Sequence, residues 1–122
     1  MIKISDAEMH VMGVLWNNSP LTAADIAQIL EPQTGWHRKT VNTLISRLVK
    51  KQALTFVAHR SGKQYSPLID RADYGQAAAS HLVTRLFGGR VAPLVAHFAE
   101  EQTLTKQDID ELKAIVQELS DD

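Results

Sequence analysis

One helix-start pattern occurs three times in this sequence of 122 residues, and it constrains the fold more than any other feature. In each case an apolar residue precedes Ser or Thr, an acidic residue follows the hydroxyl by three positions, and another apolar residue comes next. A hydroxyl and an acid at this spacing are typical of a capping box, in which each side chain bonds a backbone amide at the helix start. The pattern predicts helices that begin directly after Ser5, Thr22 and Thr105, with Glu8, Asp25 and Asp108 as the matching acids.

Apolar residues recur at helical spacing after the first two of these starts. They are Met9, Met12, Leu15 and Trp16 in the first helix, and Ile26, Ile29 and Leu30 in the second. The turn sequence Asn-Asn-Ser-Pro is expected to end the first helix, and Pro32 and Gly35 are expected to interrupt the second. Both helices are therefore predicted to be short and amphipathic.

A third helix is predicted at about residues 37–52. Its apolar residues follow the spacing i, i+3, i+4, i+7 and i+8, which places them in one stripe. They are Val41, Leu44, Ile45, Leu48 and Val49. We expect this stripe to face the first two helices. The residues then left on the outward face are Thr40, Asn42, Thr43, Ser46 and Arg47.

The segment after the third helix has the alternation of a half-buried strand. Its alternating apolar residues are Leu54, Phe56 and Ala58. Ser61 and Gly62 are expected to form a turn, and Tyr65 lies on a returning second strand. Three helices followed by a β-hairpin wing predict a winged helix-turn-helix domain.

From Asp70 onward the sequence predicts helices. Asp70 is expected to cap a helix that Gly88 and Gly89 interrupt, and two further amphipathic helices follow. We therefore predict a mainly α fold, with a winged-helix DNA-binding domain over residues 1–70 and a three-helix dimerisation domain over residues 71–122. The second domain has more apolar residues than three short helices can bury, which predicts a homodimer. The predicted interface residues are Tyr74, Leu82, Leu86, Val91, Leu94, Val95, Phe98, Ile109, Leu112, Ile115 and Leu119.

The formal net charge of −1 conceals a separation of charge along the chain. Residues 32–69 contain no Asp or Glu but seven Lys and Arg, whereas residues 91–122 contain eight acids and two Lys. Solvated surfaces normally mix the two signs, so a long segment of one sign indicates an anionic partner. The basic segment coincides with the third helix and the hairpin, which favours double-stranded DNA as that partner.

The start of the third helix carries Arg38 and Lys39, although the helix dipole is already positive there. Each cation is unfavourable by about 0.3 to 1 kcal/mol until an anion arrives. We expect a phosphate to meet free amides and both cations at this position. The short polar residues beyond it would let the helix approach base edges, where Asn can recognise adenine and a Thr methyl can contact thymine. The predicted DNA-binding residues are His37, Arg38, Lys39, Thr40, Asn42, Thr43, Ser46, Arg47, Lys50, Lys51, Arg60 and Lys63.

Several motifs resemble those of the penicillinase-repressor family, which includes the BlaI, MecI and CopY types. The matching segments are ISDAEMHVMGVLW, KTVNTLISRLVKK, GKQYSPLI and LFGGRVAPLVAHFAEEQTLTKQDIDELKAIV. The resemblance implies a homodimeric repressor that binds a palindromic operator built around TACA and TGTA. It also implies DNA contacts at Lys39, Thr40, Thr43 and Arg47, whereas Asn42 replaces an Arg found in many members.

The same resemblance implies how such a repressor is regulated. Antibiotic-responsive relatives are cleaved at an Asn-Phe bond in the penultimate helix, and the corresponding pair here is His97-Phe98. A regulatory protease is therefore an expected partner, with another signal acting on the C-terminal domain as the alternative. Copper-responsive relatives have a C-terminal Cys cluster, and this chain has no cysteine.

Three other classes of function fit the sequence less well than a repressor does. An enzyme is not expected, because no nucleophile elbow, metalloprotease motif or phosphate-binding Gly loop accompanies the five histidines. A metal-responsive repressor could use His97 and Glu100, with His81 as a third ligand, yet scattered histidines are seldom ligands, so no metal or cofactor is predicted. A winged helix used only for protein contacts is the third alternative. No apolar stretch is long enough to span a membrane, so we expect a cytoplasmic protein without membrane insertion.

Overall fold

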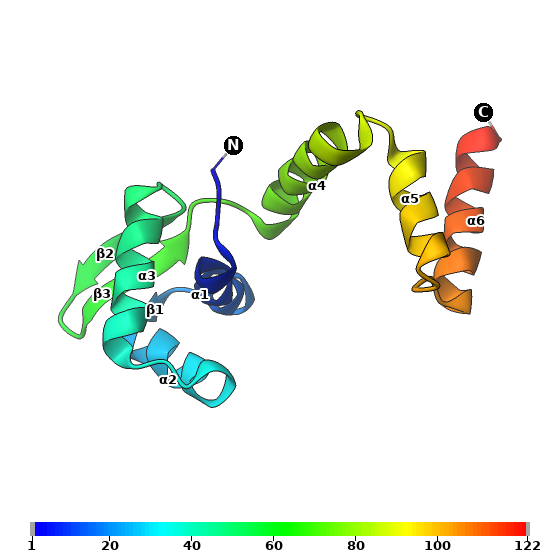
Figure 1. The fold of residues 1–122 in the computed structure, drawn as a ribbon. Helices are drawn as coiled ribbons and strands as arrows, with labels where there is room; N and C mark the ends of the chain where they lie inside the picture. The colour runs from blue at the N-terminus through cyan, green and yellow to red at the C-terminus, as the bar shows by residue number, and fades with distance from the viewer. Residues whose placement is uncertain (1, 122) are drawn as a thin grey trace. The chain divides into compact units, whose positions relative to one another are not determined.

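The computed structural model describes residues 2–121, which form a mainly helical chain with a small antiparallel sheet (Figure 1). The elements in order are α1 (Asp6–Asn17), β1 (Leu21–Thr22), α2 (Ala23–Thr34), α3 (Arg38–Lys50), β2 (Leu54–His59), β3 (Gly62–Pro67), α4 (Arg71–Phe87), α5 (Val91–Glu100) and α6 (Lys106–Ser120). Elements α1 to β3 form the predicted winged helix-turn-helix, with β2 and β3 as the wing. None of the helices in residues 2–121 is both long and apolar enough to cross a membrane.

All three predicted capping boxes are present. The hydroxyls of Ser5, Thr22 and Thr105 accept hydrogen bonds of 3.0–3.1 Å from the backbone amides three residues later. The acid at each of those later positions accepts a bond from the amide of the capping residue in return. Helices α1, α2 and α6 therefore begin where the sequence predicts.

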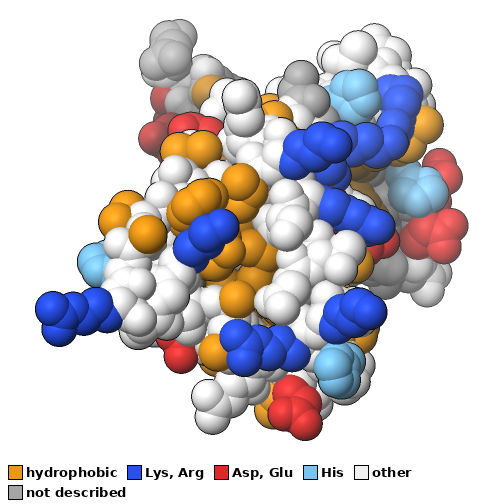
Figure 2. Space-filling view, turned by 90° about the vertical axis from the view of Figure 1, so that its left-hand side faces the viewer, with side chains coloured by type: hydrophobic (Ala, Val, Ile, Leu, Met, Phe, Trp, Pro, Cys, Tyr) orange, Lys and Arg blue, Asp and Glu red, His pale blue; other side chains and the backbone are white. Residues whose placement is uncertain are grey.

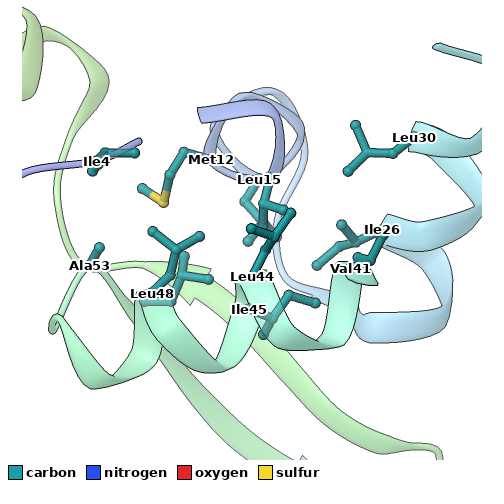
Figure 3. Close-up of a cluster of buried hydrophobic side chains, with 12 residues drawn as sticks. Ile4, Met12, Leu15, Ile26, Leu30, Val41, Leu44, Ile45, Leu48 and Ala53 are labelled. Carbon is teal, nitrogen blue, oxygen red and sulfur yellow. The ribbon is translucent and has the colours of Figure 1, made fainter. Parts of the chain in front are cut away.

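The core of the N-terminal part lies between α1, α2 and α3 (Figure 3). In the close-up, apolar side chains from the three helices point toward one another, and the stripe of α3 faces α1 and α2 as predicted. The buried members are Ile4, Val11, Met12, Leu15, Ile26, Leu30, Val41, Leu44, Ile45, Leu48, Ala53 and Leu54. Burying each large aliphatic side chain stabilises the fold by about 1.5 to 3 kcal/mol, and this fixes which face of α3 remains outside.

The sheet differs from the prediction in two respects. It has a third strand, β1, and the strand order is β1-β3-β2, with Leu21 opposite Tyr65. The predicted turn at Ser61 and Gly62 is wrong by one residue, because His59 pairs with Gly62 and the turn lies between them. Gly62 has φ +110°, a value that favours glycine, so the glycine is required at the first position of β3 and not in the turn itself.

The prediction that Pro32 interrupts the second helix is wrong, because α2 continues through Pro32 to Thr34. Proline removes one amide donor, yet the last turn is closed by other bonds. The Thr34 hydroxyl donates to the Leu30 carbonyl at 2.9 Å, and the amide of Gly35 donates to the Glu31 carbonyl at 2.8 Å. Gly35 ends the helix at φ +67°, as a C-cap glycine does.

The chain divides into two compact units, one ending at Ala77 and the other beginning at Ala78. This division lies inside α4, whereas the sequence predicted a boundary after Asp70. Asp70 does cap α4 as expected, because its carboxylate accepts a 3.2 Å bond from the Ala72 amide. The difference arises because Tyr74, in the second turn of α4, packs against the N-terminal core.

The second unit leaves many of its large apolar side chains exposed. Val83 is buried, at 8% exposed. The exposed apolar residues in this unit include Leu86, Val91, Phe98, Ile109, Ile115, Val116 and Leu119. Within the unit, residues of α5, of α6 and of the loop between them form an apolar groove. Its apolar lining residues are Leu94, Val95, Phe98, Leu104, Leu112 and Ile115, and Asp108 and Glu111 also line it.

Candidate nucleic-acid interface

The outward face of α3 is open and polar, as the sequence predicts. The predicted outward residues, Thr40, Asn42, Thr43, Ser46 and Arg47, are all exposed. A shallow groove runs along this face, and we call its lining residues the recognition face: Lys39, Asn42, Thr43, Ser46, Arg47 and Lys50. Short side chains thus lie between three cations on one helix surface.

The side of the molecule that carries α3 and the wing is basic. Figure 2 shows Lys and Arg side chains spread across this side, with acidic side chains mainly toward the edges of the view. Residues 32–69, which contain no Asp or Glu, contribute Lys and Arg to this surface, and apolar side chains lie between the cations in the same view. Such a surface attracts a polyanion and gives it a high local concentration.

The start of α3 is capped by its own preceding residue. The Nδ1 atom of His37 accepts a 3.1 Å hydrogen bond from the Lys39 amide, and the His37 carbonyl accepts a 2.9 Å bond from the Thr40 amide. The expectation that a phosphate would meet free amides here is therefore wrong in part, because His37 already uses the Lys39 amide. Arg38 and Lys39 remain exposed, so charge is the main attraction for a phosphate at this position.

Thr43 has a specific side-chain arrangement within the recognition face. Its hydroxyl donates a 3.0 Å hydrogen bond to the Lys39 carbonyl one turn earlier. This bond commits the hydroxyl to the helix backbone and leaves the methyl group as the part of the side chain free for other contacts. A free Thr methyl is suited to contact with a thymine methyl in the major groove.

Lys51 differs from the other predicted DNA-binding cations. Its ammonium pairs with the Glu8 carboxylate and also donates a 2.8 Å hydrogen bond to the Lys3 carbonyl. Residues 32–69 contain no acid of their own, but Glu8 of α1 neutralises Lys51 from outside that segment. Lys51 lies one position beyond the end of α3 and pairs with a residue of α1, whereas Lys50 lines the recognition face.

The wing carries the remaining predicted cations. Arg60 lies in the hairpin turn, and Lys63 lies on β3 with its ammonium 4.4 Å from the centre of the Phe56 ring. The Phe56 ring is in turn 5.8 Å from that of Tyr65 on the neighbouring strand. This stacking holds the Lys63 stem against the wing, and a cation over an aromatic face is stabilised by about 0.5 to 1 kcal/mol at an exposed site.

Other predicted residues are not brought into a site. Within residues 2–121 no three His, Asp or Glu side chains are grouped so that they could hold a metal ion, so His81, His97 and Glu100 do not form one. Tyr74, predicted at a dimer interface, instead packs on the N-terminal core. His97 and Phe98 both lie in α5 and are exposed.

Comparison with known proteins gives the family. The model of the penicillinase repressor family matches residues 4–118, which is most of the chain. The chain belongs to the penicillinase repressor family. Its curated relatives include the penicillinase repressor of Bacillus licheniformis, which is 34% identical over 95% of this chain and 91% of that protein. The methicillin resistance regulatory protein MecI of Staphylococcus aureus is 30% identical over 93% of each chain.

A solved structure of this penicillinase repressor family resembles the N-terminal part. The monomeric form of BlaI from Bacillus licheniformis, determined in complex with the blaP half-operator, matches with a TM-score of 0.54 and 37% identity. The match covers 61% of this chain and 92% of that structure. The chain is thus a penicillinase repressor family member with a winged-helix domain like that of a DNA-binding relative.

Proposed function

We propose that the protein is a transcriptional repressor that binds double-stranded DNA as a homodimer. The observation that carries this proposal is the recognition face, where exposed Lys39, Arg47 and Lys50 surround short polar side chains on a helix packed firmly against the core. A relative with 37% identity to this chain is described in complex with a half-operator. We propose no catalytic role, and DNA as the partner implies a cytoplasmic protein.

In the proposed complex, α3 enters the major groove of a palindromic operator built around TACA and TGTA. Lys39 and Arg47 would bind backbone phosphates, with Arg38, Lys50, Arg60 and Lys63 as further cationic contacts. Asn42 and Thr43 would contact bases, Asn42 through its amide and Thr43 through its methyl group. His37, Thr40 and Ser46 lie beside these residues and would complete the contact surface.

The second unit would form the dimer. Its apolar side chains are exposed in a single chain, and a second copy that covered them would gain about 25 cal/mol for each Å² of apolar surface removed from water. The pairing would present two recognition helices to half-sites about one helical turn apart. The proposed interface is the predicted set without Tyr74.

Release from DNA would act on this second unit, by proteolysis or by another signal. The peptide bond between His97 and Phe98 lies near the C-terminal end of α5, three residues before the helix ends at Glu100. A protease binds an extended substrate, so cleavage there would require the last turn of α5 to unwind. A regulatory protease is therefore proposed as a partner that acts on a locally opened helix.

Binding of purified protein to a TACA/TGTA palindrome and to random duplex tests this function. About 6 to 10 phosphate contacts would weaken binding by about 10³-fold to 10⁵-fold between 50 and 200 mM salt. Lys39→Ala and Arg47→Ala should weaken binding to both duplexes, whereas Asn42→Ala and Thr43→Ala should mainly reduce the difference between them. Equal affinity for both duplexes, or no dependence on salt, would contradict the proposal.

A further inference from the structure

His37 uses one of its two ring nitrogens to cap α3. Its Nδ1 atom accepts a 3.1 Å hydrogen bond from the Lys39 amide, and its backbone is extended, with φ −68° and ψ 149°, as in other N-cap residues. An imidazole nitrogen accepts a hydrogen bond only when it carries no proton. The cap therefore requires an imidazole whose Nδ1 atom is unprotonated.

The same hydrogen bond determines which ring nitrogen carries the proton. A neutral imidazole has one N–H group, so a ring that accepts at Nδ1 has its proton on Nε2. The His37 side chain is exposed, and its Nε2 atom forms no hydrogen bond with any of residues 2–121. His37 thus presents an uncharged donor to solvent, on a ring that the cap holds in one orientation.

The surroundings of this donor indicate which acceptor it can meet. His37 directly precedes the exposed cations Arg38 and Lys39, and residues 32–69 contain no Asp or Glu that could accept from it within the segment. The oxygens of a DNA phosphate diester only accept hydrogen bonds, which suits a group that only donates. Because Nδ1 already uses the Lys39 amide, the imidazole and not an open helix start presents the donor.

We propose that His37 donates its Nε2–H group to a phosphate of the DNA backbone, as a neutral ligand that its own cap holds in place. The inference rests on the proposed function and deepens it, since it gives one residue of the DNA-binding surface a defined chemical role. Lys39 and Arg47 would attract phosphates by charge, whereas His37 would add a directional bond. An uncharged contact releases no counterion, so it should strengthen binding by the same factor at low and high salt.

Two amide side chains separate the two roles of the ring. Asn places a polar group near the position of Nδ1, so His37→Asn keeps the cap and lacks the outer donor. Gln places its NH₂ group near the position of Nε2, so His37→Gln keeps the outer donor and lacks the cap. His37→Ser is a second variant of the first kind, because Ser is a good N-cap residue whose side chain is too short to reach the position of Nε2.

Binding of the full-length variants is measured to a single half-site duplex and to a random duplex of the same length, each over a series of salt concentrations. Thermal unfolding first establishes that each variant is folded at the temperature of the binding measurement. We expect His37→Asn and His37→Ser to weaken binding to both duplexes by about fivefold, as the loss of one hydrogen bond would, with an unchanged salt-dependence slope. His37→Gln should bind within about twofold of wild type.

Lys39→Ala is the matched control for a charged contact, and it should lower the salt-dependence slope by about 1. The same decrease in His37→Asn would mean that His37 binds as a cation, which would overturn the neutral donor. Unchanged affinity in both His37→Asn and His37→Ser would overturn the contact itself.

Two further outcomes also contradict the proposal. A loss confined to the half-site duplex would mean that His37 contacts a base and not a phosphate. An equal loss in His37→Gln would mean that the cap, and not the Nε2–H group, supports binding.

Nitrogen NMR of the imidazole in the DNA-free protein tests the ring proton directly. The chain has five histidines, and the signals that disappear in His37→Asn identify those of His37. We expect the neutral ring to carry its proton on Nε2. A proton on Nδ1 of the neutral ring would overturn the inference.

The measurements distinguish this inference from the proposed function. A wild-type protein that binds neither duplex would contradict both the proposed function and the phosphate contact, whatever the position of the ring proton. A wild-type protein that binds the half-site duplex as tightly as His37→Asn and His37→Ser do would overturn the contact alone and leave the proposed function in place.

Discussion

The ammonium of Lys51 and the carboxylate of Glu8 form an ion pair that joins the residue after α3 to the first turn of α1. The Glu8 carboxylate also accepts a 2.9 Å bond from the Ser5 amide within its capping box. Burial of this side chain would raise its pKa, but the hydrogen bonds from Lys51 and Ser5 outweigh burial and hold the pKa of Glu8 below its ordinary value of 4.5. One carboxylate thus both caps α1 and fixes the position of α3.

Glu8→Gln should lower the free energy of unfolding near neutral pH by about 1 to 3 kcal/mol, because charge-assisted hydrogen bonds to a buried group are lost. The folded pKa of Glu8 is depressed, so its contribution is present above the unfolded value and is lost as pH falls through the folded pKa. Urea unfolding at a series of pH values measures the difference between wild type and variant. That difference should shrink in acid, and a difference that stays constant would contradict the ion pair.

Asp25→Asn is the control for this prediction. Asp25 occupies the same capping-box position in α2, but it is exposed and forms its box without a Lys partner. We expect this variant to lose about 1 kcal/mol or less.

Lys50 and Lys51 are neighbours in sequence, but substitutions at the two positions should affect different properties. A change at Lys50 should affect DNA binding, and a change at Lys51 should affect stability. Lys50→Gln should weaken binding to a half-site duplex and lower the salt-dependence slope by about 1, because one phosphate contact is lost. Lys51→Gln should mainly reduce stability, since it leaves the buried Glu8 carboxylate without its cation. Fluorescence anisotropy and urea unfolding on both variants separate the two effects. If fully folded Lys51→Gln protein lost more DNA affinity than Lys50→Gln protein, Lys51 and not Lys50 would be the phosphate contact.

The cap on α3 should depend on the position of one acceptor atom in residue 37. Asn places its oxygen close to where Nδ1 of His37 lies, so His37→Asn should keep stability within about 0.5 kcal/mol. His37→Gln has an acceptor one bond further out and should lose about 1 kcal/mol, as a lost N-cap does. Thermal unfolding compares the variants. Equal losses would mean that the bond to the Lys39 amide contributes little.

A charge in the apolar groove of the second unit should separate the dimer. Leu112→Asp or Phe98→Asp would place an unpaired carboxylate in the proposed interface and raise the dimer dissociation constant by about 100-fold or more. Glu118→Gln, on the exposed surface of α6, is the control. Sedimentation measures the state of each protein. A truncation after Ala77 should give a monomeric winged helix, and a dimer after this truncation would place the interface elsewhere.

Local signals in the sequence predicted the winged helix well. The capping boxes at Ser5, Thr22 and Thr105 depend on residues three positions apart, so the start of each helix can be read without tertiary information. The apolar stripe of α3 has the same local character. When that stripe is buried, the opposite face of α3 is left exposed. This exposed face is the recognition face.

The missed features depend on partners distant in sequence. Lys51 lies 43 residues from Glu8, and Tyr74 lies 70 residues from Ile4. No periodicity in one segment indicates such a pairing. Because Lys51 follows a run of cations in α3, the pattern predicted a DNA contact for it as for its neighbours. Because Tyr74 has helical spacing with the other apolar residues of α4, the pattern predicted the same dimer interface for it. In both cases the tertiary fold, and not the local sequence pattern, determines which surface the side chain contacts.

The short strand β1 connects the wing to the helix-turn-helix, because it pairs with β3 and directly precedes α2. Thr22 pairs with Gln64 of β3, and the same residue caps α2 through the Asp25 amide. Peeling β3 away from β1 would therefore disturb the start of α2, so the base of the wing and α2 should open in one event. Amide protons at the base of β3 should exchange with solvent at rates close to those of α2, while those beside the hairpin turn exchange by local fraying. The strand pairing of two residues thus extends cooperative protection from the helical core into the wing.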